Sequence, residues 1–106
     1  MYWTCIWWNL ITFGIFYFGG KVPYISSTKS LSGHALGAAG VHESIFSLIM
    51  LNENFLVGSA NIENLDEKLK GTPIIFENKN IPVKRVLSNS FGFGGTNACL
   101  IFEKPN

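Results

Sequence analysis

Near its C-terminus the chain reads Asn89-Ser90-Phe91-Gly92-Phe93-Gly94-Gly95-Thr96-Asn97. Its three glycines, at positions 92, 94 and 95, allow backbone conformations with positive φ and let another group approach the main chain closely. The two phenylalanines set this loop apart from an ordinary turn, which favours Asn, Asp, Ser and Pro. One interpretation is a loop that shapes or gates an apolar, substrate-sized cavity. The other is a glycine-rich β-turn with buried aromatic side chains.

The segments that flank this loop have the composition of strands. Residues 85–90 and 98–102 predict an antiparallel hairpin with an enlarged loop. The rest of the chain from Lys21 onward predicts an α/β unit whose helix is apolar around most of its circumference, which is typical of a buried helix. The expected elements are a strand at 22–26, a polar loop at 27–33, the helix at 34–52, short strands at 55–57 and 74–76, and a helical turn at 65–69.

Length and composition restrict the class of protein. A chain of 106 residues is one domain at most. Its net charge of +1 provides no electrostatic footprint for nucleic acid. The hydrophobic content of 47% is high for so short a soluble domain, which indicates apolar faces that something else covers. Cys5 and Cys99 match no metal or redox spacing, so we expect reduced thiols in a cytoplasmic protein, with Cys99 as a small core residue.

The composition changes abruptly near residue 20. All the charged residues lie at or after Lys21, whereas Trp3, Trp7 and Trp8 lie in the first eight positions. Residues 1–20 therefore form an uncharged, Trp-rich segment without a clear helical or strand period, and residues 21–106 form the domain. The segment is just long enough for a membrane span, but it lacks the basic region and cleavage site of a secretory signal. A truncated or shifted reading frame is the interpretation we favour.

A second motif, Thr28-Lys29-Ser30-Leu31-Ser32-Gly33-His34, leads into the expected helix. The positive end of the helix dipole and the Lys29 ammonium both disfavour a second proton on His34. A neutral histidine can donate an N–H to a developing oxyanion or enolate without being a strong acid. The alternative interpretation is a helix-capping histidine beside a solvated lysine.

Together the two motifs resemble the C-terminal end of the β-ketoacyl-[acyl-carrier-protein] synthases. The resemblance rests on residues 27–40, which run from Ser27 through His34 to Gly40, and on residues 88–97, and it extends from about Phe18 to the C-terminus. Residues 61–67 and 87–90 resemble the type I bacterial condensing enzymes more than type II. The resemblance implies a thiolase fold, of which this chain holds an incomplete C-terminal part, with a mixed sheet packed on a buried helix.

The resemblance also implies an activity, the decarboxylating Claisen condensation of fatty-acid elongation. An acyl group is carried on an active-site cysteine, and malonyl-carrier protein loses carbon dioxide to give the carbanion that attacks it. His34 matches the histidine that binds the malonyl thioester carbonyl, and Lys29 matches a lysine of the same site. Phe93 matches the gating phenylalanine, whose backbone N–H is an oxyanion-hole donor, and Phe91 is its neighbour.

Three further residues match structural positions of the family. Glu43 would be a lone carboxylate on an apolar helix, which is costly unless the charge is paired. We therefore expect it to pair with Lys29 or with a bound monovalent cation, which Ser88 and Asn89 would help to hold. No other metal or cofactor is expected, because the phosphopantetheine arrives on the carrier protein. The implied partners are acyl carrier protein, malonyl and acyl thioesters, and a second copy in a homodimer. His42 matches no catalytic position and is expected at the surface.

Two catalytic residues of the family have no counterpart here. Its nucleophilic cysteine lies on a strand-to-helix elbow with small neighbours, and neither Cys5 nor Cys99 has that context. Its first catalytic histidine is also missing, and such groups act as a unit. We therefore expect the 106-residue chain alone to be inactive. The alternatives are a non-catalytic fragment that lacks the nucleophile and a small membrane-anchored protein.

Overall fold

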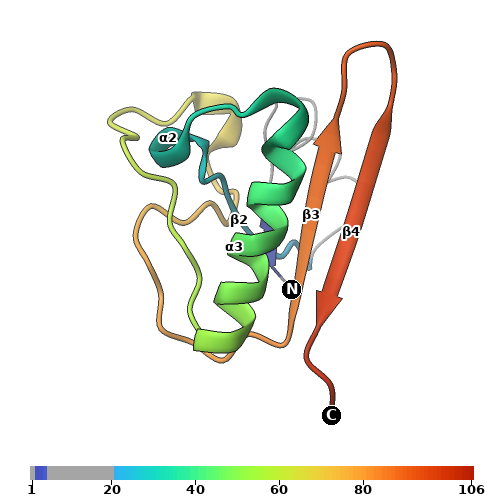
Figure 1. The fold of residues 1–106 in the computed structure, drawn as a ribbon. Coiled ribbons are helices and arrows are strands. Elements are labelled where there is room, and N and C mark those ends of the chain that lie inside the picture. The colour runs from blue at the N-terminus through green and yellow to red at the C-terminus, as the bar shows by residue number, and fades with distance from the viewer. Residues whose placement is uncertain (1, 5–20) are drawn as a thin grey trace.

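A computed structural model of the chain describes residues 2–4 and 21–106 (Figure 1). Four strands form one mixed sheet in the order β2-β1-β3-β4. β1 is parallel to both of its neighbours, and β3 and β4 form an antiparallel hairpin. The strands are β1 (Tyr2–Thr4), β2 (Tyr24–Ser26), β3 (Arg85–Phe91) and β4 (Asn97–Glu103).

The strand expectations are confirmed for the hairpin and for β2. β1 was not expected, because three residues are too few to show a period of two. Most of the Trp-rich segment lies outside the described residues. The expected strands at 55–57 and 74–76 are wrong as strands, because each is reduced to one isolated bridge, Leu56 with Lys79 and Ile74 with Ile25.

The helical segment begins later than expected. Residues 27–33 contain a four-residue helix, α2 (Lys29–Ser32), and the long helix is α3 (Ala39–Glu53), preceded by the 3-10 turn η1 (Leu36–Ala38). Leu36 has φ of 50°, a left-handed conformation that an α-helix cannot contain, so the chain turns there before α3 begins. A second 3-10 turn, η2 (Glu67–Leu69), confirms the helical turn expected at 65–69.

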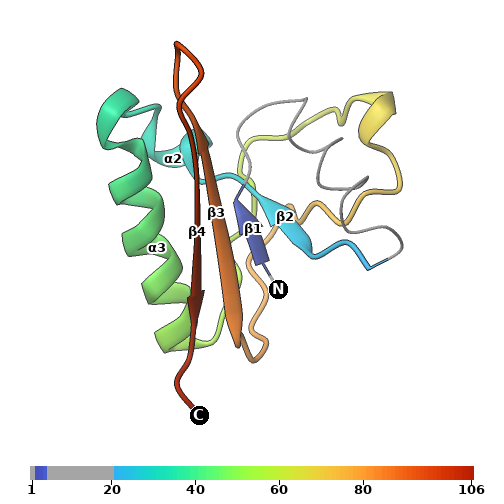
Figure 2. The ribbon, with the colours of Figure 1, turned by 90° about the vertical axis from the view of Figure 1, so that its right-hand side faces the viewer.

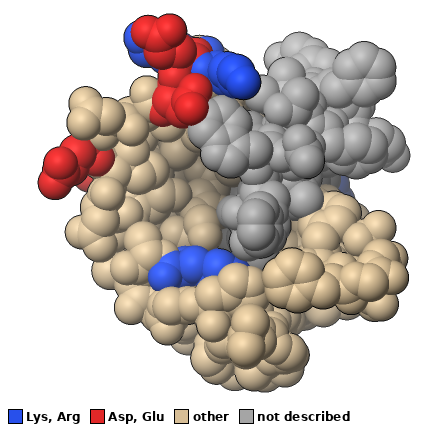
Figure 3. Space-filling model, turned by 90° about the horizontal axis from the view of Figure 1, so that it is seen from above, with Lys and Arg blue, Asp and Glu red and all other residues tan. Residues whose placement is uncertain are grey.

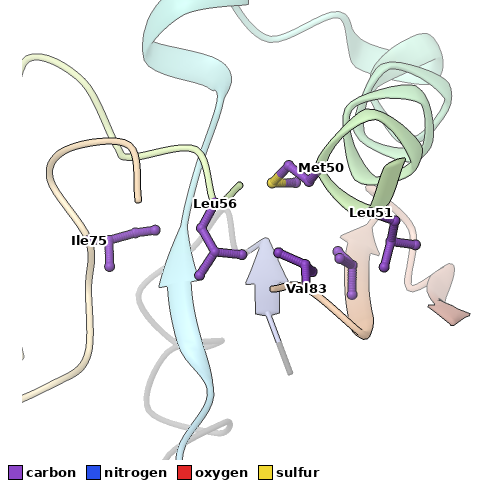
Figure 4. Packing of buried hydrophobic residues seen from close by; sticks show 6 residues of the cluster. Met50, Leu51, Leu56, Ile75 and Val83 are labelled. Atoms are coloured by element: carbon purple, nitrogen blue, oxygen red, sulfur yellow. The ribbon is translucent and has the colours of Figure 1, made fainter. Parts of the chain in front are cut away.

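The core lies between α3 and one face of the sheet (Figures 1 and 2). Met50 and Leu51 of α3 meet Val86 of β3 and the apolar side chains of the connecting segments (Figure 4). The buried cluster consists of Met50, Leu51, Leu56, Ile75, Val83 and Val86. Asn54, in a left-handed conformation, ends α3, and its side-chain oxygen accepts the Val83 N–H, so the helix end is tied to the segment before β3.

The expectation of an all-round buried helix is wrong. Only the face of α3 that meets the sheet is buried, and Val41, Ile45 and Leu48 are about half exposed or more. The described residues place a sheet against one side of the helix only, so its outer apolar side chains face solvent. Exposed apolar side chains of this kind agree with the inference from composition.

Cys99 is also exposed, so the expectation of a core thiol is wrong. It pairs with Asn89 across the hairpin, on the face of the sheet opposite α3. At the far end of the hairpin Arg85 donates to Glu103 at 2.9 and 3.1 Å, and these hydrogen bonds hold the pKa of the Glu103 carboxyl below its usual value.

The core makes a testable distinction between two apolar residues of α3. Met50 is 1% exposed, whereas Leu48 is 52% exposed. Replacing Met50 by Ala removes buried methylene groups and leaves a cavity, so we expect a loss of about 3 kcal/mol in the free energy of unfolding. Leu48→Ala should lower it by less than about 1 kcal/mol. Urea denaturation followed by circular dichroism measures both, and equal losses would show that the core is misplaced.

Candidate active site

The centre of the candidate site is the carboxylate of Glu43, on the second turn of α3. Its side chain is 4% exposed, and Lys29 of α2 donates its ammonium to Oε1. The Lys29 side chain is itself 16% exposed. A charge buried in this way is stable only when it is paired and hydrogen-bonded. The pairing of Glu43 with Lys29 that the sequence predicts is therefore present.

Two serines of β3 bind the second oxygen of the same carboxylate. Ser88 Oγ donates to Glu43 Oε2 at 3.0 Å, and Ser90 Oγ donates to it at 3.3 Å. Side chains two residues apart in a strand point to the same face of the sheet. Ser90 is therefore the partner of Ser88 at this carboxylate, and Asn89 lies on the opposite face.

Sequence reasoning named Asn89 and missed Ser90. The signal that could have found Ser90 was the strand period, because Ser88 and Ser90 lie on one face of a segment already expected to be a strand. Glu43 thus joins α2, α3 and β3 through Lys29, Ser88 and Ser90. These groups satisfy both carboxylate oxygens, so no second cation is needed there to balance the charge. The cation site at Ser88 and Asn89 stays a prediction.

His34 is exposed in the segment between α2 and η1, and not on the first turn of a helix as expected. Its ring nitrogen Nδ1 accepts the backbone N–H of Leu36 at 3.0 Å. A nitrogen that accepts a hydrogen bond carries no proton, so the neutral ring has its proton on Nε2. The Leu36 contact therefore orients the ring and leaves an Nε2–H donor that faces away from it.

The aromatic-glycine loop is the turn of the hairpin. Gly92 donates its N–H to the Thr96 carbonyl at 2.6 Å, and Gly94 and Gly95 both have φ near 90°, which favours glycine. The interpretation as a turn with buried aromatic side chains is wrong in one respect, because Phe93 is 90% exposed. Phe91, the last residue of β3, is 41% exposed. An aromatic side chain as exposed as Phe93 is free to contact a ligand or another part of a larger protein.

These elements lie at one end of the molecule. α2, the first turn of α3 and the turn of the hairpin all lie toward the upper end in Figure 1, and most of the described surface at this end carries no charge (Figure 3). His42 is exposed, as expected, and its ring lies 6.4 Å from that of Phe46. Within residues 2–4 and 21–106, Cys99 is the one free cysteine and no cluster of metal-binding side chains is found. None of the helices in this part of the chain is long and apolar enough to span a membrane.

Comparison with known proteins shows which family the chain resembles. Residues 15–63 match the C-terminal domain of the β-ketoacyl synthases. Over most of its length the chain is similar to the C-terminal part of the β-ketoacyl synthases. It is 58% identical over 90 residues to the 3-oxoacyl-[acyl-carrier-protein] synthase 1 of Haemophilus influenzae, and 54% identical over 87 residues to that of Escherichia coli. These alignments cover 84% and 82% of this chain but 22% and 21% of the relatives, so the chain spans about a fifth of their length.

Solved structures show the same fold. A β-ketoacyl synthase from Burkholderia phymatum is 35% identical with a TM-score of 0.72, and the match covers 79% of this chain and 21% of that one. The ishigamide ketosynthase/chain length factor has a TM-score of 0.84 at 24% identity, over 91% of this chain and 24% of that one. The fold is thus part of the thiolase fold, as the sequence predicts.

The Lys29–Glu43 pair can be tested against an exposed pair in the same chain. Lys29→Met leaves the buried Glu43 charge without its partner, so we expect the free energy of unfolding to fall by about 3 kcal/mol. Lys70→Met removes the partner of the exposed Glu67, 3.7 Å away, and should change it by less than about 1 kcal/mol. Urea denaturation near pH 7 measures both. If Lys29→Met is as mild as Lys70→Met, Glu43 is not a buried charge that depends on Lys29.

Proposed function

We propose that the chain is the C-terminal part of a 3-oxoacyl-[acyl-carrier-protein] synthase that catalyses decarboxylative condensation in fatty-acid elongation. The observation that supports it most directly is the hydrogen bond from the Leu36 N–H to His34 Nδ1, which orients the ring and places its donor proton on Nε2. The identity of 58% to a synthase of this kind supports the same reaction.

In the proposed step His34 Nε2–H donates to the thioester carbonyl oxygen of the malonyl group. The bond between the malonyl carboxylate and the methylene carbon breaks, carbon dioxide leaves, and the electron pair forms an enolate whose oxygen the imidazole stabilises. The enolate carbon then attacks the carbonyl of an acyl group held as a cysteine thioester, and the cysteine leaves as thiolate. No described residue is that cysteine, so the proposal requires it from another part of a synthase.

Lys29 and Glu43 hold the segment that carries His34. Because Glu43 neutralises the Lys29 ammonium, the pair acts by fixing α2 against α3 and β3. Phe93 is proposed to close over the acyl chain, and its backbone N–H to donate to the oxyanion of the acyl-transfer step. Acyl carrier protein, with its phosphopantetheine-bound malonyl and acyl groups, is the proposed partner, and the homodimer of the family stays a prediction.

The activity is testable in a chimera, because the synthase of Escherichia coli has a matching segment of 87 residues. In a chimera that carries residues 20–106 of this chain, we expect condensation of acyl- and malonyl-carrier protein. His34→Ala should reduce malonyl decarboxylation by a factor of about 100 or more, because it removes an oxyanion donor. Phe93→Ala should mainly slow acyl transfer, and His42→Ala serves as the surface control. Carbon dioxide release and acyl-enzyme formation are measured separately.

Two results would contradict the proposal. One is decarboxylation that His34→Ala leaves unchanged in an active chimera. The other is condensation by the purified 106-residue chain that His34→Ala abolishes, since the chain alone is expected to be inactive.

A further inference from the structure

Ser90 occupies a special place in the hairpin, because it is the last residue before Phe91 and the turn. Its hydroxyl is 3.3 Å from Glu43 Oε2, and Oγ also lies 3.6 Å from the position that a Cβ on Gly40 would take. Ser90 thus bonds to the second turn of α3 and lies close to the backbone of its first turn. It is half-buried, whereas every residue from Phe91 to Ile101 is exposed.

The turn beyond Ser90 is held mainly by the hairpin itself. Within the turn the Gly92 N–H donates to the Thr96 carbonyl and the Gly95 N–H donates to the Gly92 carbonyl. The pairing of β3 with β4 ends at Phe91 and Asn97. Of the two side-chain hydrogen bonds from β3 to Glu43, that of Ser90 lies nearer to the turn. The direction in which the turn presents Phe93 therefore depends on where Ser90 places the end of β3.

We propose that Ser90 is a positioning residue, which fixes the aromatic-glycine turn against the Lys29–Glu43 pair. Ser88 shares its acceptor but lies two residues farther from the turn, at a fully enclosed part of the strand. Ser88 satisfies the buried carboxylate, and Ser90 sets the position of Phe93 relative to His34. The effect of Ser90 on turnover rests on the proposed function, whereas its effect on the turn does not.

The first test compares two variants of the 106-residue chain that differ in shape only slightly. Ser90→Thr keeps the hydroxyl and Ser90→Val removes it, and both β-branched residues suit a strand. We expect amide hydrogen exchange at Gly92 to be about fivefold faster in Ser90→Val than in Ser90→Thr. Ser88→Ala is the matched control, and it should accelerate exchange at Gly92 less than Ser90→Val does. Equal exchange in Ser90→Thr and Ser90→Val, or a larger effect of Ser88→Ala, would overturn the proposal.

The second test uses the chimera and separates two partial reactions. Ser90→Val should slow acyl-enzyme formation about fivefold with little change in the KM for malonyl-carrier protein, and Ser90→Thr should restore it. Equal rates of acyl-enzyme formation in Ser90→Val and Ser90→Thr, in an active chimera, would overturn the proposal. A chimera without any activity would contradict the proposed function, and the exchange measurement would still decide the role of Ser90.

Discussion

The arrangement of the candidate site depends on one buried carboxylate. Glu43 lies on the face of α3 that meets the sheet, where an unpaired charge would be strongly destabilising. Lys29 supplies the opposite charge, and Ser88 and Ser90 supply the remaining hydrogen bonds. Because these partners come from α2 and β3, the need to satisfy Glu43 brings three segments to one end of the molecule. That end carries His34 on one side and the turn with Phe93 on the other.

Much of this arrangement follows from local rules. The strand-like composition on both sides of the glycine-rich loop predicted the hairpin, and the low tolerance for a lone buried charge predicted that Glu43 pairs with Lys29 or with a bound cation. The strand period would have predicted Ser90 as well, had it been applied from Ser88. The tautomer of His34 was beyond such rules, because it depends on the hydrogen bond from the Leu36 N–H, which no residue preference indicates. The sequence did not predict β1, because this strand has only three residues and pairs with strands that are distant in the sequence.

The sequence of α3 predicts a helix that is buried on all sides, but one face of α3 is exposed. Its outer face carries Val41, Ile45, Leu48 and Ile49, all of which are accessible within the described part of the chain. The synthases that the chain matches are about four times as long. The sequence of α3 thus has the pattern of a helix enclosed on all sides, while the described residues enclose it on one. The same reasoning applies to Phe93, whose exposure suits a contact beyond this chain.

The claim that Glu43 holds the three segments together is tested most directly by amide hydrogen exchange in Glu43→Gln, which keeps the shape of the side chain and removes its charge. The account predicts that protection falls together at Leu31 to Gly33, at the end of α2, and at Gly92 in the turn, whereas the buried residues Val86 and Leu87 of β3 stay protected. Loss of protection that is uniform over the whole chain, or unchanged protection in α2 and the turn, would contradict it.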